Sequence, residues 1–182
     1  MSAPRAAAFL DRDNTIIEDP GYLHEPDRVV LLPRAAEGLA ALSRAGWPLV
    51  IVSNQAGIAR GMYGPDAFAA VNARLELLLA PHHVRLLAAY YCPHHPDVGG
   101  PCDCRKPGVA LFRRAAAEHG LDLAASWYLG DRWRDVQPAL TLAGRGILVN
   151  PRPDDEELRL AATAHVPRVD DLVQAATLVQ GG

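Results

Sequence analysis

Two carboxylates follow an apolar run in the stretch Phe9-Leu10-Asp11-Arg12-Asp13-Asn14-Thr15. The Ala, Phe and Leu residues before them predict a strand over residues 6–10. Side chains two residues apart share one side of a strand, so Asp11 and Asp13 should point the same way. Open α/β folds bind their ligands at the carboxyl edge of a parallel sheet. The stretch therefore predicts such a sheet, with a carboxylate site at its edge.

The pair Asp11 and Asp13 suits phosphoryl transfer. One carboxylate can attack phosphorus and form a covalent phospho-enzyme, while its neighbour moves the proton. Two like charges this close need a divalent cation, and Mg²⁺ binds both carboxylate oxygens and substrate phosphate. An isolated Asp-x-Asp pair is more often a solvated turn or a helix cap, so the rest of the chain has to decide.

Further polar residues follow in chain order. Ser53 comes after the apolar run 49–52, Lys106 precedes a predicted helix, and Asp131 comes after the run 127–130. The set resembles the haloacid dehalogenase superfamily of phosphohydrolases over residues 5–150. The first motif of that superfamily corresponds to Asp11 and Asp13, the second to Ser53, the third to Lys106, and the fourth to Asp131 with Asp135.

The resemblance implies a role for each matched residue. Asp11 would be the nucleophile, Asp13 the general acid and base, and Ser53 and Lys106 would hold the phosphoryl oxygens. Mg²⁺ would be bound by Asp11, by Asp131, and by the backbone carbonyl of Asp13. Substrate contacts are expected from Asp19, Pro20, Gly21, Tyr22, Asn54, Gln55, Ala56, Arg105 and Arg132.

Two positions depart from the usual spelling of these motifs. Asn14 stands where relatives have Gly, and Arg132 stands where they commonly have Lys. Asn tolerates the left-handed backbone region better than other non-Gly residues, so the turn after Asp13 can survive. Arg132 keeps the positive charge but changes the hydrogen-bond geometry.

All three cysteines of the chain lie in one loop. Cys92 and His94 form a Cys-x-His pair, Cys102 and Cys104 form a Cys-x-Cys pair, and seven residues separate the two pairs. This donor set predicts a closed tetrahedral zinc site with a structural role, because protein fills all four positions. A disulfide is less favoured, since three cysteines leave one unpaired. His95 is the alternative to His94.

The cysteine loop leads directly into Arg105-Lys106-Pro107. A loop folded around zinc would fix these two cations, and preorganised charge stabilises a transition state better than charge on a mobile loop. We expect Lys106 to neutralise the transferring phosphoryl group. Arg105 can offer its planar fork to a second anionic group of the substrate.

The spelling around these motifs narrows the resemblance. Residues 9–13, 21–25, 53–61 and 91–96 look like the D-glycero-D-manno-heptose 1,7-bisphosphate 7-phosphatases. Histidinol-phosphate phosphatases, which also carry the zinc loop, are the alternative, and a non-catalytic zinc-stabilised binding module is a third interpretation. Arg60 and Arg105 favour the bisphosphate, because histidinol phosphate carries an amine that would prefer a carboxylate.

Apolar runs alternate with helical patterns, which predicts a doubly wound, Rossmann-like α/β sheet. We expect strands at residues 6–10, 48–52, 86–91, 126–129, 146–149 and 166–169. Helices are expected at residues 35–44, 65–79, 109–119, 136–143, 154–164 and 170–179. Neither the segment 16–47 nor the segment 54–105 has room for a cap domain, so the site should be open.

Composition is typical of a globular protein, with 49% hydrophobic and 21% charged residues. A length of 182 residues is most simply one domain, residues 1–182. A net charge of −3 gives no basic footprint for nucleic acid. No run is long enough for a membrane span, and the start Met1-Ser2-Ala3-Pro4-Arg5 has no signal-peptide pattern. We expect a cytoplasmic monomer that acts on a small sugar phosphate.

Overall fold

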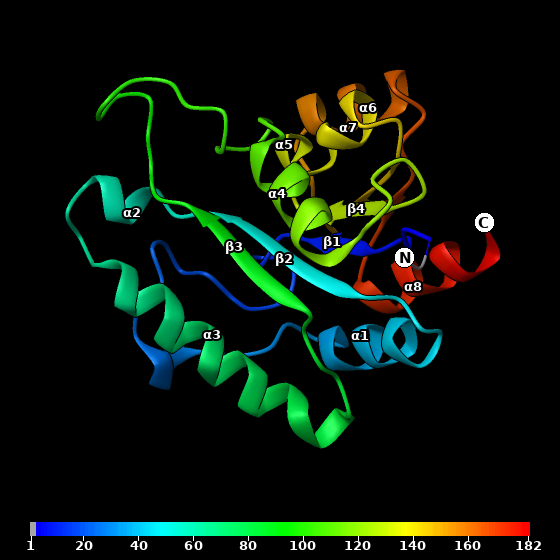
Figure 1. The fold of residues 1–182 in the computed structure, drawn as a ribbon, viewed down its shortest axis with the longest axis horizontal. Coiled ribbons are helices and arrows are strands. Elements are labelled where there is room, and N and C mark those ends of the chain that lie inside the picture. Colours follow the sequence, from blue (N-terminus) through cyan, green and yellow to red (C-terminus); the bar gives the residue numbers. More distant parts are fainter. Residues whose placement is uncertain (1–2) are drawn as a thin grey trace.

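A computed structural model describes residues 3–182 and contains a six-stranded sheet in the order β3-β2-β1-β4-β5-β6 (Figure 1). The strands are β1 (Ala8–Leu10), β2 (Leu49–Asn54), β3 (Ala88–Cys92), β4 (Trp127–Gly130), β5 (Arg145–Val149) and β6 (Arg168–Val169). All neighbouring strands are parallel. The strand order reverses between β1 and β4, which is where open α/β sheets bind ligands. The predicted doubly wound α/β fold is confirmed.

Helices cover both faces of the sheet (Figure 1). They are α1 (Ala35–Arg44), α2 (Ala56–Ala59), α3 (Pro65–Leu79), α4 (Ala110–His119), α5 (Trp133–Val136), α6 (Pro138–Thr141), α7 (Asp155–Thr163) and α8 (Leu172–Gly181), with 3-10 turns at Pro26–Arg28 and Ala80–His82. One face packs on α1, α3 and α8, and the other packs on α4 and α6. Both faces are therefore dry, which explains the nearly continuous apolar strands.

Alternation along β1 shows how the two cores form. The Leu10 side chain joins the core beneath α1, α3 and α8. Phe9 points the other way and packs on Phe112 of α4 and Tyr128 of β4, with ring centroids 5.3 and 5.2 Å apart. This packing on both faces holds β1, and with it the loop that follows, in a fixed position.

Most predicted element boundaries agree with the structure to within two residues, and α1 and α3 agree at both ends. The predicted helix 136–143 is wrong in detail. It is two short helices, α5 and α6, and it starts earlier, at Trp133. Pro138 begins α6, where its missing N–H costs nothing, but it could not continue α5 with a regular hydrogen bond. The short helix α2 was not predicted.

The two segments in which a cap domain could have been inserted contain elements of the same α/β unit. Residues 16–47 hold a 3-10 turn and α1, and residues 54–105 hold α2, α3, the turn Ala80–His82, β3 and the cysteine loop. This agrees with the capless fold that was expected.

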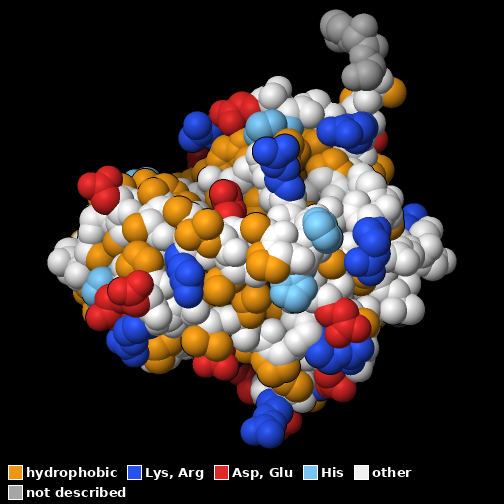
Figure 2. All heavy atoms as spheres, turned by 90° about the horizontal axis from the view of Figure 1, so that it is seen from below, with side chains coloured by type: hydrophobic (Ala, Val, Ile, Leu, Met, Phe, Trp, Pro, Cys, Tyr) orange, Lys and Arg blue, Asp and Glu red, His pale blue; other side chains and the backbone are white. Residues whose placement is uncertain are grey.

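The surface carries charges of both signs. Seen from below, on the side of α1 and α3, Lys and Arg side chains are interspersed with Asp and Glu (Figure 2). Within residues 3–182, no helix has the length and apolar character to cross a membrane. Met1 and Ser2, which belong to the N-terminal run used to predict the location, lie outside the described residues.

Candidate active site

Three carboxylates meet where the strand order reverses. Asp11 follows β1, Asp131 follows β4, and Asp135 lies on α5. Each offers a carboxylate oxygen, and these oxygens lie within 4.8 Å of one another. All three side chains are buried. Oxygen ligands in this number and spacing suit a hard divalent cation such as Mg²⁺.

The local backbone explains why these carboxylates converge. Leu10 and Leu129 are paired across the parallel strands β1 and β4, and the Asp11 N–H donates to the Leu129 carbonyl at 2.8 Å. Asp135 folds back over the end of β4 at Gly130. A Cβ atom on Gly130 would lie 2.2 Å from the Asp135 Cβ. Asp135 can therefore lie this close to the end of β4 only because residue 130 is a glycine.

Lys106 lies beside the carboxylates and is buried with them. Its Nζ lies 2.5 Å from Asp11 Oδ1 and 2.8 Å from Asp135 Oδ1. The Lys106 backbone is held by Asn54 at the end of β2, whose Oδ1 accepts from the Lys106 N–H at 2.9 Å and whose Nδ2 donates to its carbonyl at 3.2 Å. These two hydrogen bonds to one amide side chain fix the position from which the ammonium group enters the site.

One ammonium faces three buried carboxylates, and the proton affinities reflect the imbalance. Burial raises the pKa of Asp11 well above its usual value, against the attraction of Lys106. Burial, together with the charge of Asp135, raises the pKa of Asp131 to about 7. Burial lowers the pKa of Lys106, but Asp11 and Asp135 outweigh it and raise that pKa overall. The site therefore favours an additional cation.

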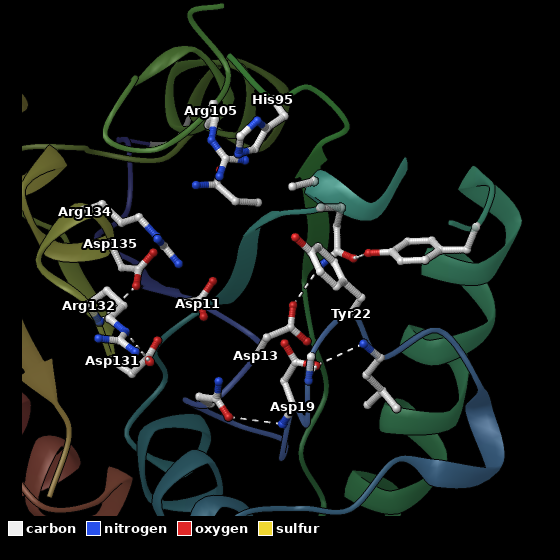
Figure 3. Close-up of a pocket in the computed structure, with 17 residues that line it drawn as sticks. Asp11, Asp13, Asp19, Tyr22, His95, Arg105, Asp131, Arg132, Arg134 and Asp135 are labelled. Atoms are coloured by element: carbon white, nitrogen blue, oxygen red, sulfur yellow. Dashed lines mark hydrogen bonds and ion pairs between the residues drawn. The ribbon is translucent and has the colours of Figure 1, made fainter. Parts of the chain in front are cut away.

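Asp13 is separated from this carboxylate group. Arg12 donates to both of its oxygens, at 3.0 and 3.2 Å. Ser53 Oγ and Gln55 Nε2 donate to Asp13 Oδ2 at 3.2 and 2.7 Å. Arg12 is 1% exposed and also donates to Asn72 of α3 at 3.2 Å. The Asp13 carboxylate is thus fixed by three neighbours on the opposite side of the site from Asp131 (Figure 3).

Asp11 and Asp13 both line a pocket of about 370 Å³ (Figure 3). Of the predicted substrate contacts, the pocket is lined by Asp19, Gly21, Tyr22, Asn54, Gln55, Ala56, Arg105 and Arg132. Among the remaining predicted residues, Ser53 is fully buried and does not line it, and neither do Lys106 and Pro20. Ser53 Oγ instead donates a hydrogen bond to Asp13 Oδ2 and accepts one from Gln55 Nε2 at 2.7 Å.

Several residues that line the pocket were not predicted as site residues. They are Asn14, Leu23, Tyr63, His95, Arg134 and Asp135. The sequence places Asp135 in the fourth motif but does not predict that it belongs to the metal group. Tyr63 donates to Gln55 Oε1 at 2.7 Å, and Gln55 in turn donates to Asp13. Of these two hydrogen bonds, only the one from Gln55 to Asp13 could be anticipated from the sequence, because Gln55 closely follows Ser53 of the second motif.

A tight loop forms the wall that carries Tyr22. Asp19 Oδ1 accepts from the N–H groups of Gly21 and Leu23 at 2.9 and 3.0 Å, so this carboxylate holds the loop as well as lining the pocket. Asn14 has a φ of 61°, and its Oδ1 accepts from the Asp19 N–H at 3.1 Å. The predicted left-handed backbone at Asn14 is therefore confirmed, and its side chain couples the turn after Asp13 to this wall.

A second group of donors lies in the cysteine loop. Cys92, His94, Cys102 and Cys104 each offer a ligand atom within 4.8 Å of the others. The three Sγ atoms are 3.0 to 3.6 Å apart, and His94 Nδ1 lies 3.2 Å from Cys104 Sγ. The donor set and its spacing fit a tetrahedral zinc ion, whose bonds to sulfur are about 2.3 Å long.

The two neighbouring histidines of this loop have different surroundings. Among the described residues, the donor group contains His94 and not His95, and the choice of His94 as a zinc ligand stays a prediction. His95 instead lies with its Nε2 3.4 Å from Arg60 Nη2 and lines the pocket. Arg105 Nη1 donates to the His94 carbonyl at 3.1 Å, so the loop that holds the donor group also holds Arg105 at the pocket.

Comparisons with known proteins agree with this geometry. Residues 103–175 match the HAD-hydrolase-like family model. The chain is 38% identical to a D-glycero-beta-D-manno-heptose-1,7-bisphosphate 7-phosphatase of Photorhabdus laumondii, over 93% of this chain and 94% of that one. It is 37% identical to the enzyme of the same name from Escherichia coli K12, over 96% and 95% of the two chains.

A solved structure of a heptose bisphosphate phosphatase is also similar to this chain. The crystal structure of D,D-heptose 1,7-bisphosphate phosphatase from B. bronchiseptica, complexed with magnesium and phosphate, superposes with a TM-score of 0.83. The two chains are 30% identical, and the match covers 97% of this chain and 99% of the other.

Proposed function

The chain belongs to the heptose bisphosphate phosphatases within the haloacid dehalogenase-like hydrolases, and on that basis we propose that it removes the 7-phosphate of D-glycero-D-manno-heptose 1,7-bisphosphate. The observation that carries this function is the buried group of Asp11, Asp131 and Asp135 with Lys106, at the reversal point of the sheet. The three carboxylates of that group line a pocket that is also lined by Arg105, Arg132 and Arg134.

Mg²⁺ would be held by Asp11 and Asp131, with Asp135 beside them, and would neutralise charge on the transferring phosphoryl group. Lys106 supplies the fixed positive charge of the protein at the same point, 2.5 Å from Asp11. The Asp13 backbone carbonyl remains the proposed third ligand. A site with this balance of charge binds a phosphate ester and its leaving oxygen in one defined orientation.

The reaction would proceed in two displacements. An Asp11 oxygen attacks phosphorus, the bond from phosphorus to the sugar oxygen breaks, and Asp13 gives its proton to that leaving oxygen. Asp13 then takes a proton from water, whose oxygen attacks the aspartyl-phosphate and releases inorganic phosphate and the Asp11 carboxylate. Asp11 and Asp13 both line the pocket, which supports this division of roles.

The pocket walls support a substrate with a second phosphate. Arg105 and Arg132 line the pocket on different elements, and a guanidinium can bind phosphate through two parallel hydrogen bonds. Tyr22 and the segment 54–56 offer the surface for the sugar. Histidinol phosphate has no second anion and carries an amine, so this wall suits it less well.

Phosphate release from a substrate panel tests the proposal. Heptose 1,7-bisphosphate, fructose 1,6-bisphosphate and histidinol phosphate would be compared by kcat/KM with Mg²⁺ present. We expect a strong preference for the heptose bisphosphate. A preference for histidinol phosphate would overturn the substrate assignment and leave the phosphatase chemistry intact, whereas failure to hydrolyse all three would overturn both.

The zinc ion is proposed as a structural cofactor of the Cys92, His94, Cys102 and Cys104 group. Its donor atoms are all supplied by protein, which leaves no position for a catalytic water. The cytoplasmic location, the monomeric state, the single domain and the lack of a nucleic-acid partner stay predictions from the sequence.

A further inference from the structure

We propose that Arg134 is a specificity-determining residue that binds the non-reacting phosphate of the substrate together with Arg105. This inference rests on the proposed bisphosphatase function. Arg134 lies on α5 and Arg105 lies at the end of the cysteine loop, and both line the pocket. Their side chains reach from two different walls into the space above Asp11 (Figure 3).

The other cations of the site already have partners. Lys106 is paired with Asp11 and Asp135. Arg132 lies 3.5 Å from Asp131 and 3.7 Å from Asp154. Among residues 3–182, the Arg134 guanidinium has no hydrogen bond or ion pair, although it lines a pocket that is also lined by five aspartates. An exposed arginine facing the pocket without a protein partner is available to an anionic ligand.

The backbone that carries Arg134 is held in place on both sides. The Arg132 N–H donates to Asp135 Oδ2 at 3.1 Å, and the Asp135 N–H donates to the Arg132 carbonyl at 2.9 Å. The Trp133 N–H donates to the Glu157 carboxylate of α7. Arg134 therefore projects from a fixed turn, and only its own side chain has to be ordered when a ligand binds.

Charge balance calls for more than one arginine at the second phosphate. A phosphate monoester carries between one and two negative charges near neutral pH. Arg105 already uses Nη1 to hold the His94 carbonyl. A guanidinium on the facing wall completes a two-sided clamp, because each can offer parallel N–H donors to phosphate oxygens. A substrate with a single phosphate, held at Asp11, would leave this clamp empty.

The test compares two substrates that share the reacting phosphate. Phosphate release from heptose 1,7-bisphosphate and heptose 7-phosphate would be measured with Mg²⁺ for the wild type, Arg134→Gln, Arg134→Lys and Arg113→Gln. Arg113 is an exposed arginine of α4 that does not line the pocket, so its replacement is matched in charge. All four proteins would be checked for equal thermal stability.

We expect Arg134→Gln to lower kcat/KM for the bisphosphate by about tenfold or more, because a hydrogen bond to a charged group is lost. The loss should fall on KM, since a non-reacting group is bound equally before and during the reaction. The kcat/KM of Arg134→Gln for heptose 7-phosphate should differ from that of the wild type by less than about twofold. For the bisphosphate, the kcat/KM of Arg134→Lys should lie between those of the wild type and Arg134→Gln. The kcat/KM of Arg113→Gln should match that of the wild type.

The outcomes separate this inference from the proposed function. A wild type that does not prefer the bisphosphate would overturn the proposed function. A wild type that prefers it, with the preference unchanged in Arg134→Gln, would overturn this inference alone. An equal loss of kcat on both substrates would also overturn it, because that result would place Arg134 at the reacting phosphate or show it only balancing the charge of Asp131.

Discussion

Lys106 Nζ lies 2.5 Å from Asp11 Oδ1, so the residue expected to attack phosphorus and the residue expected to neutralise it form a buried ion pair. Asp11 is 8% exposed and Lys106 is 3% exposed. The pair joins the end of β1 to the end of the cysteine loop, 95 residues further along the chain. This contact therefore links the proposed Mg²⁺ site, which contains Asp11, to the cysteine loop of the proposed zinc site, which leads into Lys106.

Replacing Asp11 by Asn should abolish turnover while keeping the fold. The amide cannot form the acyl phosphate, and loss of a nucleophile typically costs a factor of about 10⁴ or more in kcat. Phosphate release and far-ultraviolet circular dichroism would be measured, with Asp27→Asn, an exposed aspartate outside the pocket, as the control. Activity within tenfold of wild type would contradict the mechanism.

Lys106→Met should destabilise the Mg²⁺-free protein strongly. The substitution keeps an unbranched side chain of similar size but leaves Asp11 and Asp135 without their shared cation, and removing one partner of a buried pair costs about 3–5 kcal/mol. Urea unfolding would measure the free energy of unfolding in buffer without Mg²⁺ and in buffer with Mg²⁺, with the zinc ion kept in both. The loss should be smaller in Mg²⁺, which supplies another cation, and an equal loss under both conditions would contradict this prediction.

Stability without Mg²⁺ should fall as pH rises through about 7. Burial and the Asp135 charge raise the pKa of Asp131 in the folded protein to about 7, from an ordinary value of 3.8. The folded state therefore binds more protons than the unfolded state between these values, so the free energy of unfolding decreases with rising pH there. Mg²⁺ should consequently raise Tm more at pH 8 than at pH 5.5, and differential scanning fluorimetry with Mg²⁺-free buffer as the reference would measure this. A larger increase at pH 5.5 would show that this carboxylate is not part of the cation site.

Loss of the zinc ion should affect both stability and activity. His94→Ala should lower the zinc content from about one ion per chain to near zero and lower Tm by about 5 °C or more, since 1 kcal/mol corresponds to roughly 2–4 °C for a protein of this size. Activity should also fall, because the loop holds Arg105 and leads directly into Lys106. His95→Ala is the matched control and should keep its zinc by metal analysis. Zinc lost from His95→Ala and kept in His94→Ala would reverse the ligand assignment.

Gly130→Ala should damage the Mg²⁺ site without a change in charge. The added Cβ would lie 2.2 Å from the Asp135 Cβ, so this carboxylate has to move away from Asp11 and Asp131. We expect about a tenfold or greater rise in the Mg²⁺ concentration needed for half-maximal activity, as is typical when the support of a metal ligand is disturbed. Gly64→Ala is the control, because a Cβ there meets nothing within 4 Å and its φ of −95° suits any residue. Equal Mg²⁺ dependence in the two variants would contradict the role of Gly130.

The pairing of Asp13 with Arg12 shows where sequence reasoning stopped. The motif identified both aspartates, but the structure separates them. Asp11 joins the buried carboxylates, while Asp13 is held by Arg12, Ser53 and Gln55. The strand pattern of the sequence predicts that both side chains point the same way, but β1 ends at Leu10, so the alternation of a strand does not extend to Asp11 and Asp13. The surrounding loops decide which partners each side chain meets.

The sequence by itself determined the α/β class and most element boundaries. It also predicted the nucleophile motif and the choice of His94 over His95, because all of these depend on residues close together in the chain. Strand alternation, helix periodicity and ligand spacing are local patterns. Tertiary structure alone decided that Asp135 completes the carboxylate group, that Ser53 lies beneath the pocket, and that Tyr63 and Arg134 line it. These properties depend on how loops from different strands converge at one edge of the sheet, and no local pattern encodes that convergence.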